Sequence, residues 1–167
     1  TGIIDVEINI GASRKNYIKR IEIVDNNRTM DRVIRRELQL VEGDAFNQLK
    51  LDESIKRVRN LGFFSRVDVA NFRGSTDDQT VTEISVEEQS TGDLQVGVGY
   101  SSIDKATFNF GINERNFLGT GRKAEFNVGL ANKSTNIRLG LTEPYFLGRN
   151  MYASGGIFRD VRKENTY

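Results

Sequence analysis

Hydrophobic and polar positions follow two different patterns along the chain, and the change falls near residue 92. Before that point, short β-branched runs alternate with segments in which apolar residues recur every three or four positions. The second spacing is typical of amphipathic helices, whereas strict alternation indicates half-buried strands. After residue 92 only the alternation remains. The pattern therefore predicts a mixed α/β unit followed by a series of strands.

The first part is expected to fold as strand, helix, helix, strand, strand. Thr29 is the expected N-cap of the first helix, and Asn47 should cap the second, which ends at Gly62. Two helices on one face of a three-stranded sheet form a common α+β layer pair. Strands are expected at 3–10, 17–24, 65–72 and 80–88. The expected helical core residues are Met30, Val33, Ile34, Leu38, Ile55, Val58 and Leu61.

The strand at 3–10 is interpreted as the end of a preceding domain that has been cut short. This gives three segments: the remnant 1–14, an α+β domain over 15–91, and a strand-rich segment over 92–167. Eleven of the sixteen glycines lie after residue 91, which supports a boundary near Gly92.

The second part contains runs in which apolar residues alternate with small or polar ones. Four runs are regular, and a fifth, from Met151 to Phe158, is less so. Such runs are the signature of a transmembrane β-barrel with an apolar face toward lipid. A soluble antiparallel sheet with one buried face gives the same alternation. Glycines on the polar face favour the barrel, but periodicity alone leaves both structures open.

Composition excludes several classes of function. The chain of 167 residues has a net charge of +1 and no histidine or cysteine. The balanced charge argues against nucleic-acid binding. Without histidine there is no Ser-His-Asp triad, and without cysteine there is no disulfide or thiolate metal site. We therefore expect no catalytic residues, no metal and no cofactor, and a soluble α+β enzyme is disfavoured.

Seven short segments are distinctive in their order and spacing. They are Tyr17–Ile21, Arg35–Leu38, Leu61–Val67, Val86–Gly92, Gly97–Ser101, Asn116–Gly121 and Thr142–Phe146. Together they resemble the BamA-type family of outer-membrane β-barrel assembly proteins, which carry periplasmic POTRA domains before a membrane barrel. The resemblance implies that 15–91 is the last POTRA domain (β-α-α-β-β) and that 92–167 holds the first strands of an incomplete transmembrane β-barrel.

The resemblance also implies a function and a location. The parent protein would receive unfolded β-barrel proteins in the periplasm and insert them into the bacterial outer membrane. Its expected partners are accessory lipoproteins, unfolded outer-membrane proteins and outer-membrane lipid. A two-partner secretion transporter of the same superfamily is the alternative, and the segment Glu87–Gly92 favours the assembly protein.

Three groups of residues are candidate sites by this resemblance. Glu42, Arg35 and Arg36 are candidates for binding a lipoprotein partner, although a turn residue and a solvated charged face are simpler explanations. An edge strand that could pair with an extended substrate is expected at Val67, Asp68, Val69 and Ala70. The first barrel strand, whose weak pairing would open the barrel, is expected at Leu94, Gln95, Val96, Gly97, Val98, Gly99 and Tyr100. Its glycines either weaken that pairing or relieve crowding.

Overall fold

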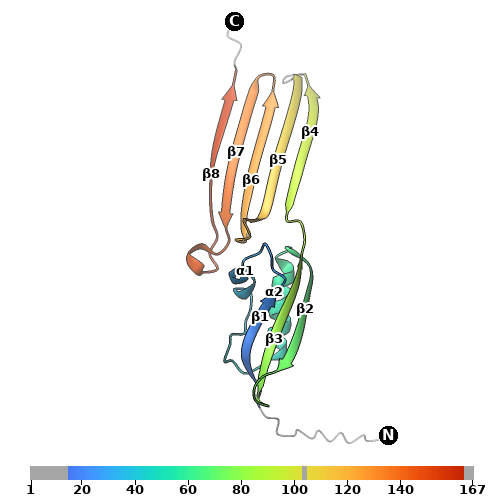
Figure 1. Ribbon diagram of the computed structural model, residues 1–167. Coiled ribbons are helices and arrows are strands. Elements are labelled where there is room, and N and C mark those ends of the chain that lie inside the picture. Colours follow the sequence, from blue (N-terminus) through green and yellow to red (C-terminus); the bar gives the residue numbers. More distant parts are fainter. Residues whose placement is uncertain (1–14, 103–104, 164–167) are drawn as a thin grey trace, which may run out of the picture.

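The computed structural model describes residues 15–102 and 105–163, and the remnant expected at 1–14 lies outside them. Two units are stacked end to end, with a small α/β unit below a taller sheet in Figure 1. The elements run from β1 (Tyr17–Val24) through α1 (Asp31–Arg35), α2 (Gln48–Asn60) and β2 (Phe64–Arg73) to β3 (Gln79–Glu88). This order is that of a POTRA domain, as the sequence predicts.

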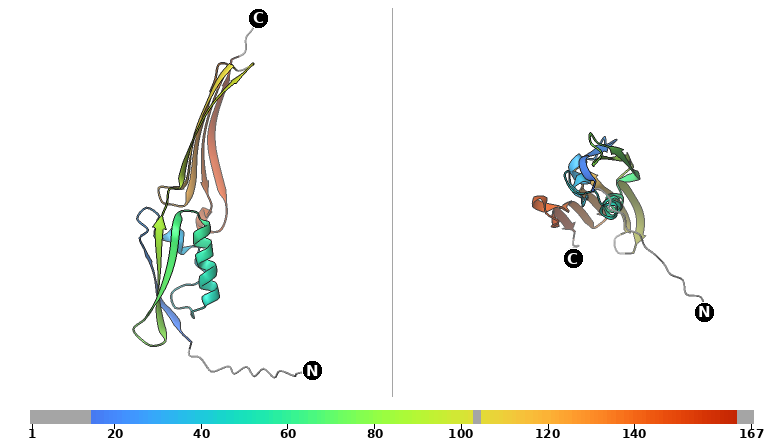
Figure 2. Two further views of the ribbon diagram at one scale, coloured as in Figure 1. Left: turned by 90° about the vertical axis from the view of Figure 1, so that its right-hand side faces the viewer. Right: turned by 90° about the horizontal axis from the view of Figure 1, so that it is seen from below.

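The α/β unit is a three-stranded sheet in the order β1-β3-β2. β1 pairs with β3 in parallel and β2 pairs with β3 in antiparallel fashion, so β3 is central. α2 packs along one face of this sheet (Figure 2). Asn47 caps α2 as predicted, because its side chain accepts a hydrogen bond of 3.1 Å from Lys50 N.

Alternate residues of the strands and one stripe of each helix form the core. β3 shows this most clearly, since every second residue from Thr80 to Val86 is buried. Burying such apolar side chains stabilises the fold by about 1.5–3 kcal/mol each. The core residues are Ile18, Ile21, Val33, Ile34, Leu40, Leu51, Ile55, Val58, Phe63, Phe64, Val67, Ile84 and Val86.

The first helix differs from its prediction in two ways. Thr29 does not cap it: Met30 is the N-cap residue and makes no side-chain cap hydrogen bond. Met30 is also 43% exposed and therefore lies outside the core. The reason is tertiary, because the Thr29 hydroxyl is buried and accepts a hydrogen bond from a residue of the upper sheet.

The upper unit is a five-stranded antiparallel meander in the order β4-β5-β6-β7-β8. Its strands are β4 (Gly92–Ser101), β5 (Lys105–Phe117), β6 (Arg122–Ala131), β7 (Ser134–Glu143) and β8 (Ala153–Arg162). A 3-10 turn, η1 (Phe146–Gly148), follows Pro144, which comes directly after the last residue of β7. β8 begins two residues later than the predicted run at Met151.

The register of these strands places apolar residues on one face and polar ones on the other. One row across the sheet joins Leu94, Ile112, Phe126 and Leu139. The next row belongs to the other face and joins Gln95, Gly111 and Asn127. Leu94 and Val98 are 64% and 82% exposed, so nothing in the described residues covers the apolar face of β4. The sheet therefore has the two-sided pattern of a barrel wall.

Candidate functional site

The two units meet where the turn between β5 and β6 rests on the segment before α1. The Met30 N–H donates to the Gly119 carbonyl at 2.9 Å, and Asn116 Nδ2 donates to Thr29 Oγ1 at 2.9 Å. Asn116 Oδ1 also accepts from Gly121 N at 2.8 Å, which fixes the turn itself. Asn116 and Thr29 are both buried. One asparagine therefore ties the barrel turn to the POTRA domain.

Gly119 and Gly121 do more than shape this turn. Both have a positive φ, at 68° and 72°. A Cβ atom on Gly119 would overlap the Arg28 carbonyl oxygen, and one on Gly121 would overlap the Arg36 guanidinium. At Gly119 glycine is required because the backbone of Arg28 lies so close, whereas at Gly121 the close neighbours are the side chains of Arg36 and Val33.

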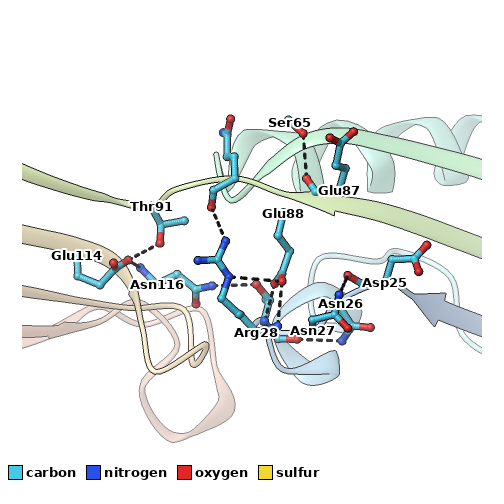
Figure 3. Close-up of polar contacts among 12 residues, drawn as sticks. Asp25, Asn26, Asn27, Arg28, Ser65, Glu87, Glu88, Thr91, Glu114 and Asn116 are labelled. Carbon is cyan, nitrogen blue, oxygen red and sulfur yellow. Dashed lines mark hydrogen bonds and ion pairs between the residues drawn. The ribbon is translucent and has the colours of Figure 1, made fainter.

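Two carboxylates, one in each unit, accept hydrogen bonds from groups near the junction (Figure 3). Glu88, at the end of β3, accepts hydrogen bonds from the backbone N–H groups of Arg28 at 2.9 Å and Thr29 at 2.6 Å. Burial raises the pKa of the Glu88 carboxyl, but these hydrogen bonds outweigh burial and hold that pKa below its usual value. Glu114 in β5 accepts from Asn116 N at 2.8 Å and from the Thr91 hydroxyl.

The far end of α1 makes a second contact with the barrel strands. The guanidinium of Arg36 lies 4.2 Å from the centre of the Tyr145 ring, just after β7. Arg36 also pairs with Glu37 at 3.8 Å. Burial and the neighbouring Glu37 raise the pKa of the Tyr145 hydroxyl. The Arg36 side chain is 19% exposed, so this candidate partner residue is largely occupied by the barrel strands.

The other two partner candidates, Arg35 and Glu42, contact each other. Arg35 forms an ion pair with Asp31 at 2.9 Å and reaches Glu42 at 3.7 Å. Glu42 Oε1 accepts from Ile21 N at 3.1 Å. Both side chains remain about half exposed. The structure thus places Arg35 of α1 beside Glu42 in the accessible turn that follows, while Arg36 contacts Tyr145 instead.

Only one edge of the POTRA sheet is free in the described part of the chain. The outer edge of β1 is covered by the segment before α2: Ile18 N donates to Asp44 O at 2.9 Å, and Gly43 N donates to Ile18 O at 2.7 Å. No strand pairs with the outer edge of β2, which includes Val67, Asp68, Val69 and Ala70. The predicted substrate strand is therefore an edge strand.

β4, which holds the predicted seam residues from Leu94 to Tyr100, is one of the two edge strands of the upper sheet, and β8 is the other. The space around its glycines separates the two explanations for them. A Cβ atom on Gly97 would lie 3.8 Å from the Asn109 Cβ, an ordinary contact, whereas one on Gly99 would lie 2.9 Å from Thr107 Oγ1. Crowding within this sheet therefore accounts for Gly99 but not for Gly97.

The described residues contain no group of three or more carboxylate, histidine or cysteine side chains that could hold a metal ion. Over the same residues, no helix is long and apolar enough to cross a membrane. The described residues instead form a docked junction, one accessible turn and three open strand edges, those of β2, β4 and β8.

Comparisons with known proteins agree with this architecture. Residues 16–89 match the POTRA family model (surface antigen variable number repeat), and residues 116–167 match the Omp85 superfamily domain. The chain is 34% identical to the outer membrane protein assembly factor BamA of Neisseria meningitidis, over 99% of this chain and 21% of that protein. It is 32% identical to BamA of Nitratidesulfovibrio vulgaris, over 96% of this chain and 21% of that protein. The chain thus spans about a fifth of the length of these relatives.

Solved structures give the same result. BamA from Haemophilus ducreyi lacking POTRA domains 1–3 matches with a TM-score of 0.79 and 32% identity, over 90% of this chain and 28% of that one. CdiB from Escherichia coli matches with a TM-score of 0.54 and 15% identity, over 79% and 26%, which shows a shared fold alone. These matches define the class: a POTRA domain followed by the first strands of an Omp85-type outer-membrane barrel. Within this class, the chain belongs to the BamA-type family of outer membrane assembly factors, and the weaker likeness to CdiB disfavours the transporter.

The contacts of this junction could not be predicted from the sequence. Thr29 is predicted only as a helix cap, and Asn116 and Tyr145 appear only within two of the motifs that resemble the family. One feature of the sequence could have indicated this contact. The turn at 116–121 contains two glycines two residues apart, whereas a single tight turn does not require both.

Proposed function

We propose that the parent protein receives unfolded β-barrel proteins in the periplasm and promotes their folding and insertion into the outer membrane. The observation that carries this proposal is that two open edges, β2 in the POTRA sheet and β4 in the barrel sheet, lie on the same side of the molecule in Figures 1 and 2, while β8 forms the opposite edge of the barrel sheet. An open edge offers unpaired backbone groups to any extended chain. Family membership supports the same function.

No covalent chemistry is required by this function. The driving force is the burial of apolar strand faces in lipid, where every backbone polar group must also be paired. The protein would lower the kinetic barrier by offering edges for pairing. We propose residues 15–91 as the periplasmic domain and 92–167 as membrane strands. The two sheets share no strand, which supports this division.

The turn that carries Glu42, together with Arg35 at the end of α1, is our proposed contact for an accessory lipoprotein. Its support is that both charged groups are half exposed and adjacent. Replacing Glu42 with Gln removes the charge while keeping the acceptor for Ile21 N. We expect E42Q to weaken copurification of lipoprotein partners from outer membranes, and unchanged copurification would remove this assignment.

The proposed function is tested by reconstituting the full-length parent into vesicles and following the folding of an added unfolded outer-membrane protein. The decisive variant is Asn71→Pro, which deletes one N–H on the open edge of β2. Proline is tolerated on edge strands when its missing N–H would face solvent. Asn71→Ala is the matched control, because it keeps that N–H but loses the side-chain contact with Thr82.

We expect the parent to accelerate folding relative to empty vesicles, N71P to slow it, and N71A to match the parent. Equal rates for N71P and N71A would show that the β2 edge is not used. No acceleration by the parent would contradict the proposed function as a whole.

A further inference from the structure

We propose that Arg59 blocks the barrel-proximal end of the open β2 edge, so that a substrate strand can pair fully along β2 only after this side chain moves. The inference rests on the proposed use of β2 for pairing and adds a residue that limits it. It begins from a single contact across the gap between α2 and β2. Arg59 Nη2 donates to the Val67 carbonyl oxygen at 2.7 Å.

The strand register shows which backbone groups of β2 face outward. Gly74 N donates to Gln79 O at 2.7 Å, so even-numbered residues here bond toward β3. Pairing groups alternate along an antiparallel strand. Val67, Val69 and Asn71 therefore present their N–H and C=O groups to the open edge. Among these, the Val67 carbonyl is occupied by Arg59.

A groove beside Arg59 offers space for the side chains of a paired strand. A groove of about 400 Å³ runs between α2 and β2 beside this edge. Its lining includes Leu51 and Ile55, which are buried and apolar, together with Arg59, Val69 and Asn71. The groove could take the inward side chains of a paired strand whose residues alternate between apolar and polar. Such alternation is the sequence signature of barrel strands.

The contact between Arg59 and Val67 lies at the end of β2 that is nearer the barrel. β2 starts next to the barrel, since Phe63 O accepts from Gln89 N at 3.0 Å at the junction. Val67 therefore lies nearer the barrel than Val69 and Asn71. While Arg59 holds Val67, an incoming strand is restricted to the part of the edge distal to the barrel. Release of Arg59 extends the edge toward the side on which β4 is open (Figure 1).

A guanidinium suits such a reversible block. Arg59 is exposed, so its hydrogen bond competes with water and can exchange. Several backbone hydrogen bonds from an incoming strand can displace one such contact. Lysine at this position would keep the charge but lack the planar fork of donors.

The test uses the full-length protein in lipid nanodiscs and a fluorescein-labelled peptide with the sequence of β6 (Arg122–Ala131). Affinity is measured by anisotropy, and residue-level amide hydrogen exchange reports which edge N–H groups become paired. The variants are Arg59→Met and Arg59→Lys, with Arg57→Met as the matched control on the same helix. The same peptide carrying Val128→Pro controls for pairing. Thermal melts confirm that each variant is folded.

In the unmodified protein we expect the peptide to slow exchange at Val69 and Asn71 but not at Val67. R59M should bind roughly threefold to tenfold more tightly, as expected for about one additional net hydrogen bond, and should also protect Val67. The affinity of R59K for the peptide should lie between those of the unmodified protein and R59M, and the affinity of R57M should equal that of the unmodified protein.

Two outcomes would overturn the proposal, and they are distinguishable. If Val67 is protected in the unmodified protein and R59M binds no more tightly, Arg59 is not a block, while pairing along β2 stands. If no edge amide is protected in any variant, pairing along β2 is itself wrong and the block has no role.

Discussion

The junction gives the sharpest prediction, because the chain contains a matched pair of glycines. Gly119 and Gly148 both follow a leucine in a turn and have φ values of 68° and 70°. A Cβ atom on Gly148 would meet nothing within 4 Å, whereas one on Gly119 would overlap the Arg28 carbonyl oxygen. Gly119→Ala and Gly148→Ala therefore share the same backbone strain, and only G119A adds a clash with the POTRA domain.

The free energy by which G119A should weaken docking follows from the contacts that the clash would break. An L-residue in the left-handed region costs about 1–2 kcal/mol, and this cost is common to both variants. Undocking in G119A additionally loses the hydrogen bonds from Met30 N to Gly119 O and from Asn116 to Thr29. At about 0.5–1.5 kcal/mol each, these give a difference of roughly 1–3 kcal/mol. This is enough to shift a docked POTRA domain toward an undocked population.

The assay is a distance measurement between two spin labels, which is straightforward because the chain has no native cysteine. Lys56→Cys on α2 and Asn132→Cys in the turn between β6 and β7 are both exposed positions. We expect the distance distribution to broaden or shift in G119A and to remain unchanged in G148A. Identical distributions in the two variants would refute the docking role of this turn.

Two further predictions concern the carboxylate and the seam. Since the pKa of folded Glu88 is lowered from 4.5, its contribution to stability is present above that pH and is lost as the pH falls through the lowered value. Glu88→Gln should therefore lower the melting temperature of the POTRA domain at pH 7 and lower it much less near pH 3; an equal effect at both would contradict this. Gly97→Ala fits without a clash and should stabilise β4 by about 0.5–1 kcal/mol, yet slow assembly in vesicles if weak pairing is functional. An unchanged assembly rate would remove that role from Gly97.

Much of the fold could be predicted because it depends on local patterns. The alternation that defines β3 and the barrel strands is set by which residues are apolar, and a change of register would move every side chain to the wrong face. Asn47 and Gly62 bound α2 through contacts within a few residues. Family resemblance then distinguished a barrel from a soluble sheet, which periodicity could not do because both structures bury one face.

The sequence by itself determined the order of elements, the faces of the strands and the family. Only the tertiary structure decided what Thr29, Arg36 and Arg59 do. Each is a polar residue whose local environment suggests a cap or a solvated charge, but each contacts a group distant in sequence or on another element. Hydrogen bonds of this kind depend on how two elements are placed in space, and hydrophobic periodicity carries no information about that placement.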